Sequence, residues 1–335
     1  MEYRQLGRAG VRVSTLCFGT MSFGGIADEA TSEAMYRRCR EAGINFFDCA
    51  NVYAAGRSEE ILGKLIADER EQLVITSKVG FPMGEGINDQ GLSRRHILAS
   101  VEASLKRLGT DRLDILFLHR FDPTTPIDET LHALDLLVRQ GKVLHTGASN
   151  WAAWQIATGL GISALHELPA FSCIQPMYNL AKRQAEVEIL PLAHAQQLGA
   201  ITYSPLGGGL LTGKYSVGVR PDRGRLVEND MYRARYADDV YYETAERFAA
   251  YAAEHGTHPV TLAIAWVARH PAVTAPIIGA RSVEQLKPSL AAADFAMDDE
   301  TYAQVAALSP APPPATDRSE EQAGFAYKGS EDRYR

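Results

Sequence analysis

Four polar residues of this chain are of types that together can protonate an oxygen: Asp48, Tyr53, Lys78 and His119. A tyrosine has a pKa of roughly 10 in water and is a poor acid at neutral pH unless a cation stabilises its phenolate. Lys78 can supply that cation, and Asp48 can keep the lysine charged and hold it in place. His119 can donate to or accept from the same oxygen. We therefore expect an acid system suited to carbonyl reduction, in which a cofactor brings the hydride.

This acid system must be positioned by regular elements, and apolar runs of strand length recur along the chain. They span 15–20, 45–50, 73–79, 113–119, 143–149, 171–178, 200–205 and 274–280. Amphipathic helical patterns follow them over 32–43, 58–67, 94–109, 128–142, 152–161, 186–199, 261–270 and 282–292. Runs that are apolar on both faces are typical of parallel strands covered by helices. Eight such units predict an α/β protein with a (β/α)8 TIM barrel rather than a doubly wound sheet, because the first strand–helix turn lacks a GxGxxG fingerprint.

Polar residues stand where these strands end, and the active site of a (β/α)8 barrel forms at that end. They are Asp48, Lys78, His119, Ser149, Asn150, Gln175, Tyr203, Ser204 and, after Gly279, Arg281. Each of them alone is more often a turn former, a solvated cation or a satisfied core histidine than a catalyst. Their recurrence on consecutive strands favours one shared site at the mouth of the barrel.

The composition argues against several classes of partner and site. The net charge is −7 and there is no long basic run, so we expect no nucleic-acid partner. No apolar stretch approaches the roughly 20 residues that cross a bilayer, and the amino-terminal residues lack the layout of a secretory signal. We therefore expect a cytoplasmic protein without a membrane span. The four cysteines share no CxxC spacing and the nine histidines are scattered, so we expect no metal site.

We expect a single barrel domain over residues 1–309 and a Pro-rich polar C-terminal tail over residues 310–335. The residues ahead of the first strand predict an N-terminal β-hairpin that turns at "GRAG" (7–10). The long loop after the seventh strand, 206–240, exceeds ordinary loop length, which is typical of function or disorder. We expect Gly43, Gly109 and Gly199 to end helices.

Several motifs match a known family in order and spacing. They are "FGTMSFGG" (18–25), "INFFDCANVYAAGRSEEILG" (44–63), "VITSKVG" (74–80), "DILFLHR" (114–120), "GKVLHTGASN" (141–150), "IQPMYNL" (174–180), "ITYSPLGGGLLTGKY" (201–215) and "PIIGARSVEQL" (276–286). The sequence thus resembles the aldo-keto reductases over nearly the whole barrel, and within them the branch of potassium-channel β subunits and bacterial glyceraldehyde-phosphate-type reductases. The resemblance implies that Tyr53 is the general acid, that Asp48 and Lys78 tune it, and that His119 assists.

The same resemblance implies NADPH, or NADP+ after the reaction, extended across the barrel mouth without a Rossmann fold. Gly19 and Thr20 match positions near the nicotinamide, and Tyr203 matches the residue that stacks on its ring. Ser149, Asn150 and Gln175 match the residues that hold the carboxamide. Other implied cofactor contacts are Asp48, Ser204, Leu206, Gly207, Gly209, Lys214 and Gly279, with the loop after the seventh strand as a clamp.

Arg281 and Ser282 match the site of the adenosine 2′-phosphate, and Gln285 matches a residue that faces the adenine. An arginine fork suits a phosphate, which favours NADPH over NADH. Pro288 and Ser289 depart from the family pattern, because many members carry Glu and Asn there for the adenine amine.

The expected substrate is a small-molecule aldehyde or ketone, and its contacts follow strand ends. The candidates are Phe23, Phe81, Arg120 and Trp151. Aromatic walls suit a general carbonyl compound, and Arg120 can hold an anionic group, although core packing accounts equally well for the aromatic residues.

Two other functions fit parts of the pattern. A lyase could use Lys78 as a Schiff-base amine, which accounts for a lysine inside an apolar strand but leaves Tyr203 and Arg281 without a role. An NADPH-binding regulatory subunit or redox sensor could hold the cofactor and turn over slowly. Homo-oligomer formation stays open at this point.

Overall fold

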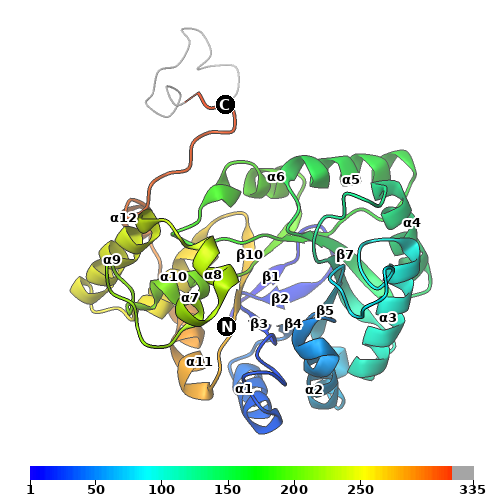
Figure 1. The fold of residues 1–335 in the computed structure, drawn as a ribbon, viewed down its shortest axis with the longest axis horizontal. Coiled ribbons are helices and arrows are strands. Elements are labelled where there is room, and N and C mark those ends of the chain that lie inside the picture. The colour runs from blue at the N-terminus through cyan, green and yellow to red at the C-terminus, as the bar shows by residue number, and fades with distance from the viewer. Residues whose placement is uncertain (319–335) are drawn as a thin grey trace.

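The computed structural model describes residues 1–318, and its centre is a closed barrel of eight parallel strands (Figure 1). The strands are β3 (Cys17–Gly19), β4 (Phe46–Asp48), β5 (Val74–Val79), β6 (Leu113–Leu118), β7 (Val143–Ser149), β8 (Cys173–Gln175), β9 (Gly199–Thr202) and β10 (Val273–Ile278). They pair in chain order, and β10 closes the ring by pairing with both β9 and β3. Each predicted strand overlaps one of these strands, and β9 and β10 each begin one residue earlier than predicted, so the predicted (β/α)8 barrel is confirmed.

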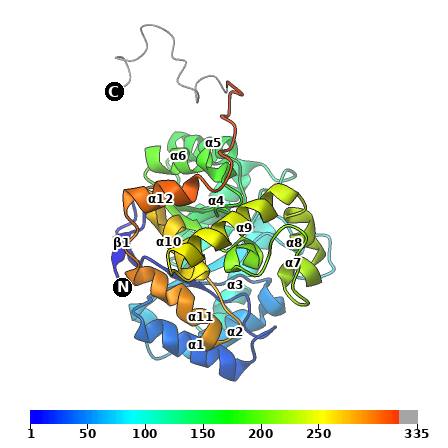
Figure 2. The ribbon, with the colours of Figure 1, turned by 90° about the vertical axis from the view of Figure 1, so that its left-hand side faces the viewer.

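Helices surround the barrel, and the figures show them as an outer layer (Figures 1 and 2). They are α1 (Glu29–Glu41), α2 (Arg57–Ile66), α3 (Arg94–Leu108), α4 (Ile127–Arg139), α5 (Ala153–Leu165), α6 (Ile189–Ala195), α7 (Arg225–Glu228), α8 (Asp230–Arg235), α9 (Asp239–Glu254), α10 (Pro259–Arg269), α11 (Val283–Leu290) and α12 (Asp299–Ala306). Short 3-10 helices are η1 (Tyr53–Gly56), η2 (Arg70–Gln72), η3 (Gln184–Glu186), η4 (Gly207–Thr212) and η5 (Ala291–Asp294). The chain thus alternates strand and helix around the ring, as a right-handed parallel barrel requires.

A small antiparallel hairpin of β1 (Tyr3–Gln5) and β2 (Arg12–Ser14) precedes the barrel, as predicted. Leu6 and Val13 of this hairpin are fully buried and belong to the same core cluster as the residues inside the barrel. The hairpin therefore covers one end of the barrel and adds apolar side chains to its interior.

The side chains of the strands alternate between the barrel interior and the helix layer. In β4, Phe46 belongs to the interior cluster and Phe47 to the outer one; in β6, Phe117 lies inside and Leu116 outside. Since the side-chain period of a strand is two, the residues two positions after Phe46 and Phe117 also face inward. Those residues are Asp48 and His119. Strand alternation therefore brings the polar strand ends together at the mouth.

The segment after β9 differs from the sequence prediction, because residues 206–240 are not one irregular loop. They hold η4, α7, α8 and the start of α9. Helices α9 and α12 were also not predicted, although 239–254 has the amphipathic pattern of a helix. Gly199 does not end a helix but lies in β9, and Gln197 takes the left-handed conformation (φ 54°) instead.

Beyond α12, residues 310–318 contain no helix or strand. Residues 319–335, which make up the rest of the predicted tail, lie outside the described residues, so the division into a barrel and a tail stays a prediction. No helix among residues 1–318 is long and apolar enough to cross a membrane.

Candidate active site

The centre of the site is a buried ion pair between Lys78 of β5 and Asp48 of β4. The Lys78 Nζ lies 2.6 Å from Asp48 Oδ2 and 2.7 Å from the carbonyl oxygen of Cys49. Both side chains are almost wholly buried. Burial alone would lower the pKa of Lys78, but the carboxylate of Asp48 and the phenol of Tyr53 outweigh it and raise that pKa. The lysine is therefore a fixed cation, and an amine with three acceptors around it is no nucleophile.

Tyr53 is the third partner of Lys78, and its hydroxyl lies 3.2 Å from the Nζ atom. Burial raises the pKa of Tyr53 to about 12, although the ammonium of Lys78 opposes the rise. The phenol is thus neutral and holds its proton at physiological pH. It lies beside the cation that would stabilise its phenolate once the proton leaves.

The turn after Tyr53 has an unusual backbone that fixes the start of α2. Ala54 (φ 47°), Ala55 (φ 53°) and Gly56 (φ 95°) are all left-handed, which is costly for the two alanines. Behind the turn, the wholly buried Glu59 accepts from Arg107 Nε at 2.7 Å and from the Ser77 hydroxyl. These contacts join α2 to α3 and β5 and hold the tyrosine in place.

His119 follows β6 and lies edge-on to two aromatic rings. Its ring centroid is 6.0 Å from that of Tyr53 and 4.6 Å from that of Phe81. Burial lowers the pKa of His119 to about 2, with help from the charges of Lys78 and Arg120. The imidazole is therefore neutral, and its buried Nδ1 has no hydrogen-bond partner among the described residues.

Two further side chains hold Asp48 from other strands. The Thr76 hydroxyl donates to Asp48 Oδ1 at 2.7 Å, and Gln175 Nε2 donates to the same oxygen at 2.8 Å. Thr20 bonds the Asp48 carbonyl oxygen through both its amide and its hydroxyl. Sequence reasoning missed Thr76; its signal is the position two residues before Lys78, which faces the same side of the strand.

The predicted carboxamide residues form one hydrogen-bonded row next to the acid system. Ser149 donates to the Gln175 carbonyl oxygen at 2.9 Å, and Asn150 Nδ2 donates to the His119 carbonyl oxygen at 2.8 Å. The Tyr203 hydroxyl donates to Asn150 Oδ1 at 2.7 Å, which ties β9 to β7. The structure therefore brings these four residues together, from the ends of three strands.

After β9 the chain turns through residues 204–209, which include several residues of positive φ. Ser204 (φ 62°), Gly207 (φ 60°) and Gly209 (φ 105°) are left-handed, and Leu206 precedes η4. A Cβ atom on Gly209 would meet no other atom within 4 Å, so its backbone is open to a ligand. Gly19, in contrast, is needed for packing, because a Cβ there would come within 2.8 Å of Ile277.

Four cations gather around this loop without an ion-pair partner in residues 1–318: Lys214, Arg225, Arg235 and Arg281. Arg225 and Arg235 flank the ring of Tyr232, and the charge of Arg235 reaches Tyr203. The charges of Lys214 and Arg281 both lie near Tyr215. Sequence reasoning missed Arg235, because nothing in the loop's pattern placed it against β9.

The start of α11, where the adenine contact of Gln285 stays a prediction, is held by two caps. Ser282 is the N-cap of α11, and its hydroxyl accepts from the Gln285 amide at 3.4 Å. The Gln285 side chain accepts from the Arg281 amide at 3.2 Å and so caps the helix backbone. Gly279 lies exposed at the end of β10, near the carbonyl oxygen of Gly19.

Comparison with known proteins agrees with this geometry. The profile of the Aldo/keto reductase family matches residues 15–310. A probable voltage-gated potassium channel subunit beta of Arabidopsis thaliana is 40% identical over 302 residues, which are 88% of this chain and 92% of that protein. The uncharacterized oxidoreductase YrpG of Bacillus subtilis (strain 168) is 38% identical over 327 residues, 93% of this chain and 97% of that protein. This chain belongs to the aldo/keto reductase family.

The substrate side of this aldo/keto reductase is only partly as expected. Phe23 is fully buried and packs against Phe18, so it is a core residue and not a wall of the mouth. Trp151 is also buried, edge-on between Phe121 and Phe171. Phe81 is half-buried against His119.

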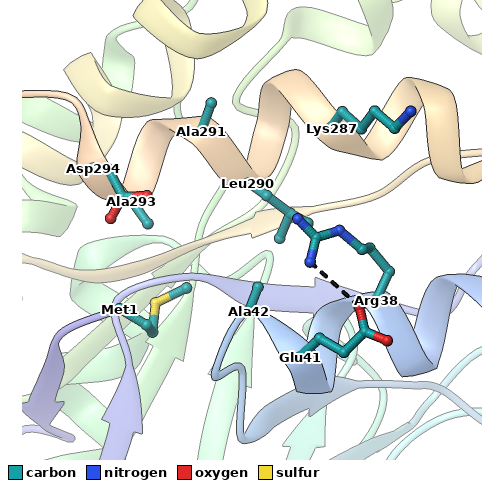
Figure 3. Close-up of a pocket in the computed structure, with 9 residues that line it drawn as sticks. All are labelled: Met1, Arg38, Glu41, Ala42, Lys287, Leu290, Ala291, Ala293 and Asp294. Atoms are coloured by element: carbon teal, nitrogen blue, oxygen red, sulfur yellow. Dashed lines mark hydrogen bonds and ion pairs between the residues drawn. The ribbon is translucent and has the colours of Figure 1, made fainter.

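A separate hollow of about 400 Å³ lies on the outside of the barrel, between α1 and α11 (Figure 3). Arg38 and Glu41 of α1 line one side and form an ion pair, and Lys287 and Leu290 of α11 line the other. None of the acid-system residues lines it, so this hollow is not the reaction site.

Proposed function

We propose that this protein reduces an aldehyde or ketone to an alcohol with NADPH, and that Tyr53 is the general acid. The observation that carries the proposal is the shared position of the Lys78 ammonium, 2.6 Å from Asp48 and 3.2 Å from the Tyr53 hydroxyl. A phenol in contact with a fixed cation can release its proton to an oxygen on which negative charge develops.

The electrostatics favour Tyr53 over His119 as the donor. His119 is neutral down to about pH 2 and carries no acidic imidazolium proton in the working range. Its role is to orient the carbonyl oxygen by a hydrogen bond, next to the tyrosine hydroxyl. Asp48 keeps Lys78 charged, and Thr76 and Gln175 keep Asp48 in position.

The residues present fit a phosphate-rich dinucleotide. Four cations without an ion-pair partner in residues 1–318 and the open backbone at Gly209 suit phosphates, and Arg281 supplies a fork for a 2′-phosphate. Asn150, Ser149 and Gln175 would hold the carboxamide, and Tyr203 would lie along the ring. When bound, NADPH supplies the hydride. The fold needs no Rossmann motif, because the strand ends and the loop after β9 provide the contacts.

Two substitutions test the proposal. In Tyr53→Phe, reduction of a neutral aldehyde, followed by NADPH absorbance, should fall to background while NADPH still quenches protein fluorescence; unchanged turnover would refute Tyr53 as the acid. In Arg281→Ala, the KM for NADPH should rise much more than the KM for NADH. An equal rise for both would show that Arg281 does not contact the 2′-phosphate.

A second candidate function rests on the 40% identity to a protein named as a potassium channel subunit beta. We propose as the alternative a cytoplasmic, NADPH-binding regulatory subunit with slow turnover, which could assemble as a homo-oligomer. Tight NADPH binding with a turnover close to the uncatalysed rate, across a panel of aldehydes and ketones, would favour this alternative over the reductase.

A further inference from the structure

Arg120 is a cation at the barrel mouth that has no partner of opposite charge among the described residues. It follows His119 directly, and its guanidinium lies over the ring of Phe81 at 5.0 Å from the centroid. It forms no ion pair and no side-chain hydrogen bond with any residue in the described range 1–318, and it is only half-buried. An arginine held flat against an aromatic ring keeps its five N–H donors available along its edge.

The acid nearest to it in sequence, Asp122, is occupied elsewhere. Its two carboxylate oxygens accept from the Leu92 amide, the Thr124 amide and hydroxyl, and the Thr125 hydroxyl. Asp122 thus shapes the loops after β5 and β6 and is not the counter-ion of Arg120.

The other positive or titratable groups around the acid system are not available to bind an anionic ligand. Lys78 is fully engaged by Asp48, Cys49 and Tyr53. His119 remains neutral at working pH. An anion that enters next to His119 therefore meets Arg120 as its one free partner on this side of the mouth, within the described residues.

We infer that Arg120 is an anion-binding subsite for the substrate, and that the preferred substrates are carbonyl compounds that carry a carboxylate or a phosphate. This inference rests on the proposed reductase function. The His119 ring and the Arg120 guanidinium both contact the ring of Phe81, so the carbonyl and the charged group of one small molecule can contact both. Phe81 lies between the two side chains, in contact with each, and offers an apolar surface to the carbon chain that joins those groups.

The test compares anionic with neutral benzaldehydes. 4-Carboxybenzaldehyde and 4-formylphenyl phosphate are compared with benzaldehyde and methyl 4-formylbenzoate, with wild type and with Arg120→Gln and Arg120→Lys. In Arg120→Gln, kcat/KM for the two anionic aldehydes should fall by about tenfold or more, mainly through KM, because a charge-assisted fork is lost. For the neutral pair it should change by less than about threefold. Arg120→Lys should restore part of the anion preference, since it keeps the charge without the fork.

Lys106→Gln is the control for net charge, because Lys106 is exposed in the last turn of α3, at the end of the barrel where β6 begins and opposite the mouth. It should leave the preference for anions unchanged. Equal losses for neutral and anionic aldehydes in Arg120→Gln, or no anion preference in wild type, would overturn the inference while reduction of neutral aldehydes still supports the reductase. No reduction of any aldehyde by wild type would instead refute the proposed function itself.

Discussion

Gln175 reaches across the barrel to hold Asp48. Their strands, β8 and β4, are four places apart in either direction around the ring, yet Gln175 Nε2 lies 2.8 Å from Asp48 Oδ1. The bond joins residues that are 127 positions apart in sequence. The acid system is thus held from both walls of the barrel, and neither neighbouring strand alone determines the position of the carboxylate.

Replacing Gln175 by leucine should impair this support. Asp48 Oδ1 would keep only the Thr76 hydroxyl as a donor, and a buried acceptor that loses a partner costs about 1–3 kcal/mol. We expect the free energy of unfolding, measured in urea, to fall by that amount and kcat to fall as well. Thr76→Val removes the other donor and is the matched control. If both variants lose stability but only Gln175→Leu loses NADPH affinity, Gln175 has a cofactor role that Thr76 lacks; if neither is less stable, these bonds do not support Asp48.

The Lys78–Asp48 pair should show strong energetic coupling. Lys78→Met leaves a buried carboxylate without its cation, which typically costs about 3–5 kcal/mol. The double variant Lys78→Met/Asp48→Asn leaves no buried charge, so we expect it to be more stable than Lys78→Met alone. A double-mutant cycle by urea unfolding measures this coupling. Additive losses would contradict it.

The dependence of kcat/KM on pH should show no step caused by titration of a histidine. Because the folded pKa of His119 is about 2 and that of Tyr53 is about 12, neither group titrates near neutrality. We expect kcat/KM for a neutral aldehyde to be flat between about pH 5 and 9. A limb near pH 6.5 that vanishes in His119→Asn would contradict a neutral, buried imidazole.

His119 should also make the fold sensitive to acid. Its folded pKa is depressed, so the unfolded chain binds a proton below about pH 6.5 that the folded chain does not. The stability is therefore fully present above the unfolded pKa and is lost as the pH falls towards 2. Unfolding free energies of wild type and His119→Asn at pH 7.5 and 5.0 test this, and the wild type should lose more on acidification.

In the left-handed turn after Tyr53, substitution of an alanine by glycine should raise the stability of the protein, whereas such a substitution usually lowers it. Ala54 is exposed and has φ 47°, so Ala54→Gly should stabilise the protein by about 0.5–1 kcal/mol despite the greater freedom of the unfolded chain. Ala157→Gly, at an exposed position within α5, is the same change in a helix and should destabilise by about 1 kcal/mol. Thermal melts of the two variants should thus shift in opposite directions.

Much of the barrel could be predicted from the sequence, because its strands and most of its helices have strong local patterns. Asp48, Lys78 and His119 were found together since each ends a buried strand, and their neighbours Phe46 and Phe117 carry the inward face. Local patterns say less about the segment after β9. Its short helices α7 and α8 depend on tertiary packing, such as Tyr232 against Gly208.

Other features could not be predicted because they depend on contacts between distant residues. The bond between Gln175 and Asp48 needs the closed ring, and Phe23 was assigned to the mouth although its ring packs into the core beside Phe18. The cap that the Gln285 side chain forms with the Arg281 amide likewise depends on the turn between β10 and α11.

The hairpin at the amino terminus bears on the proton chemistry although it contains none of the reacting groups. Leu6 and Val13 pack beneath an apolar layer that includes Phe46 and Phe117, and the ion pair lies one layer above it. The strength of a Coulomb interaction varies inversely with the local dielectric constant. Apolar side chains of the hairpin close this end of the barrel and keep the local dielectric constant low. The Coulomb interaction between the Lys78 ammonium and the Tyr53 oxygen is therefore stronger than it would be in water. The hairpin thus contributes to the low dielectric constant around Tyr53, the proposed proton donor.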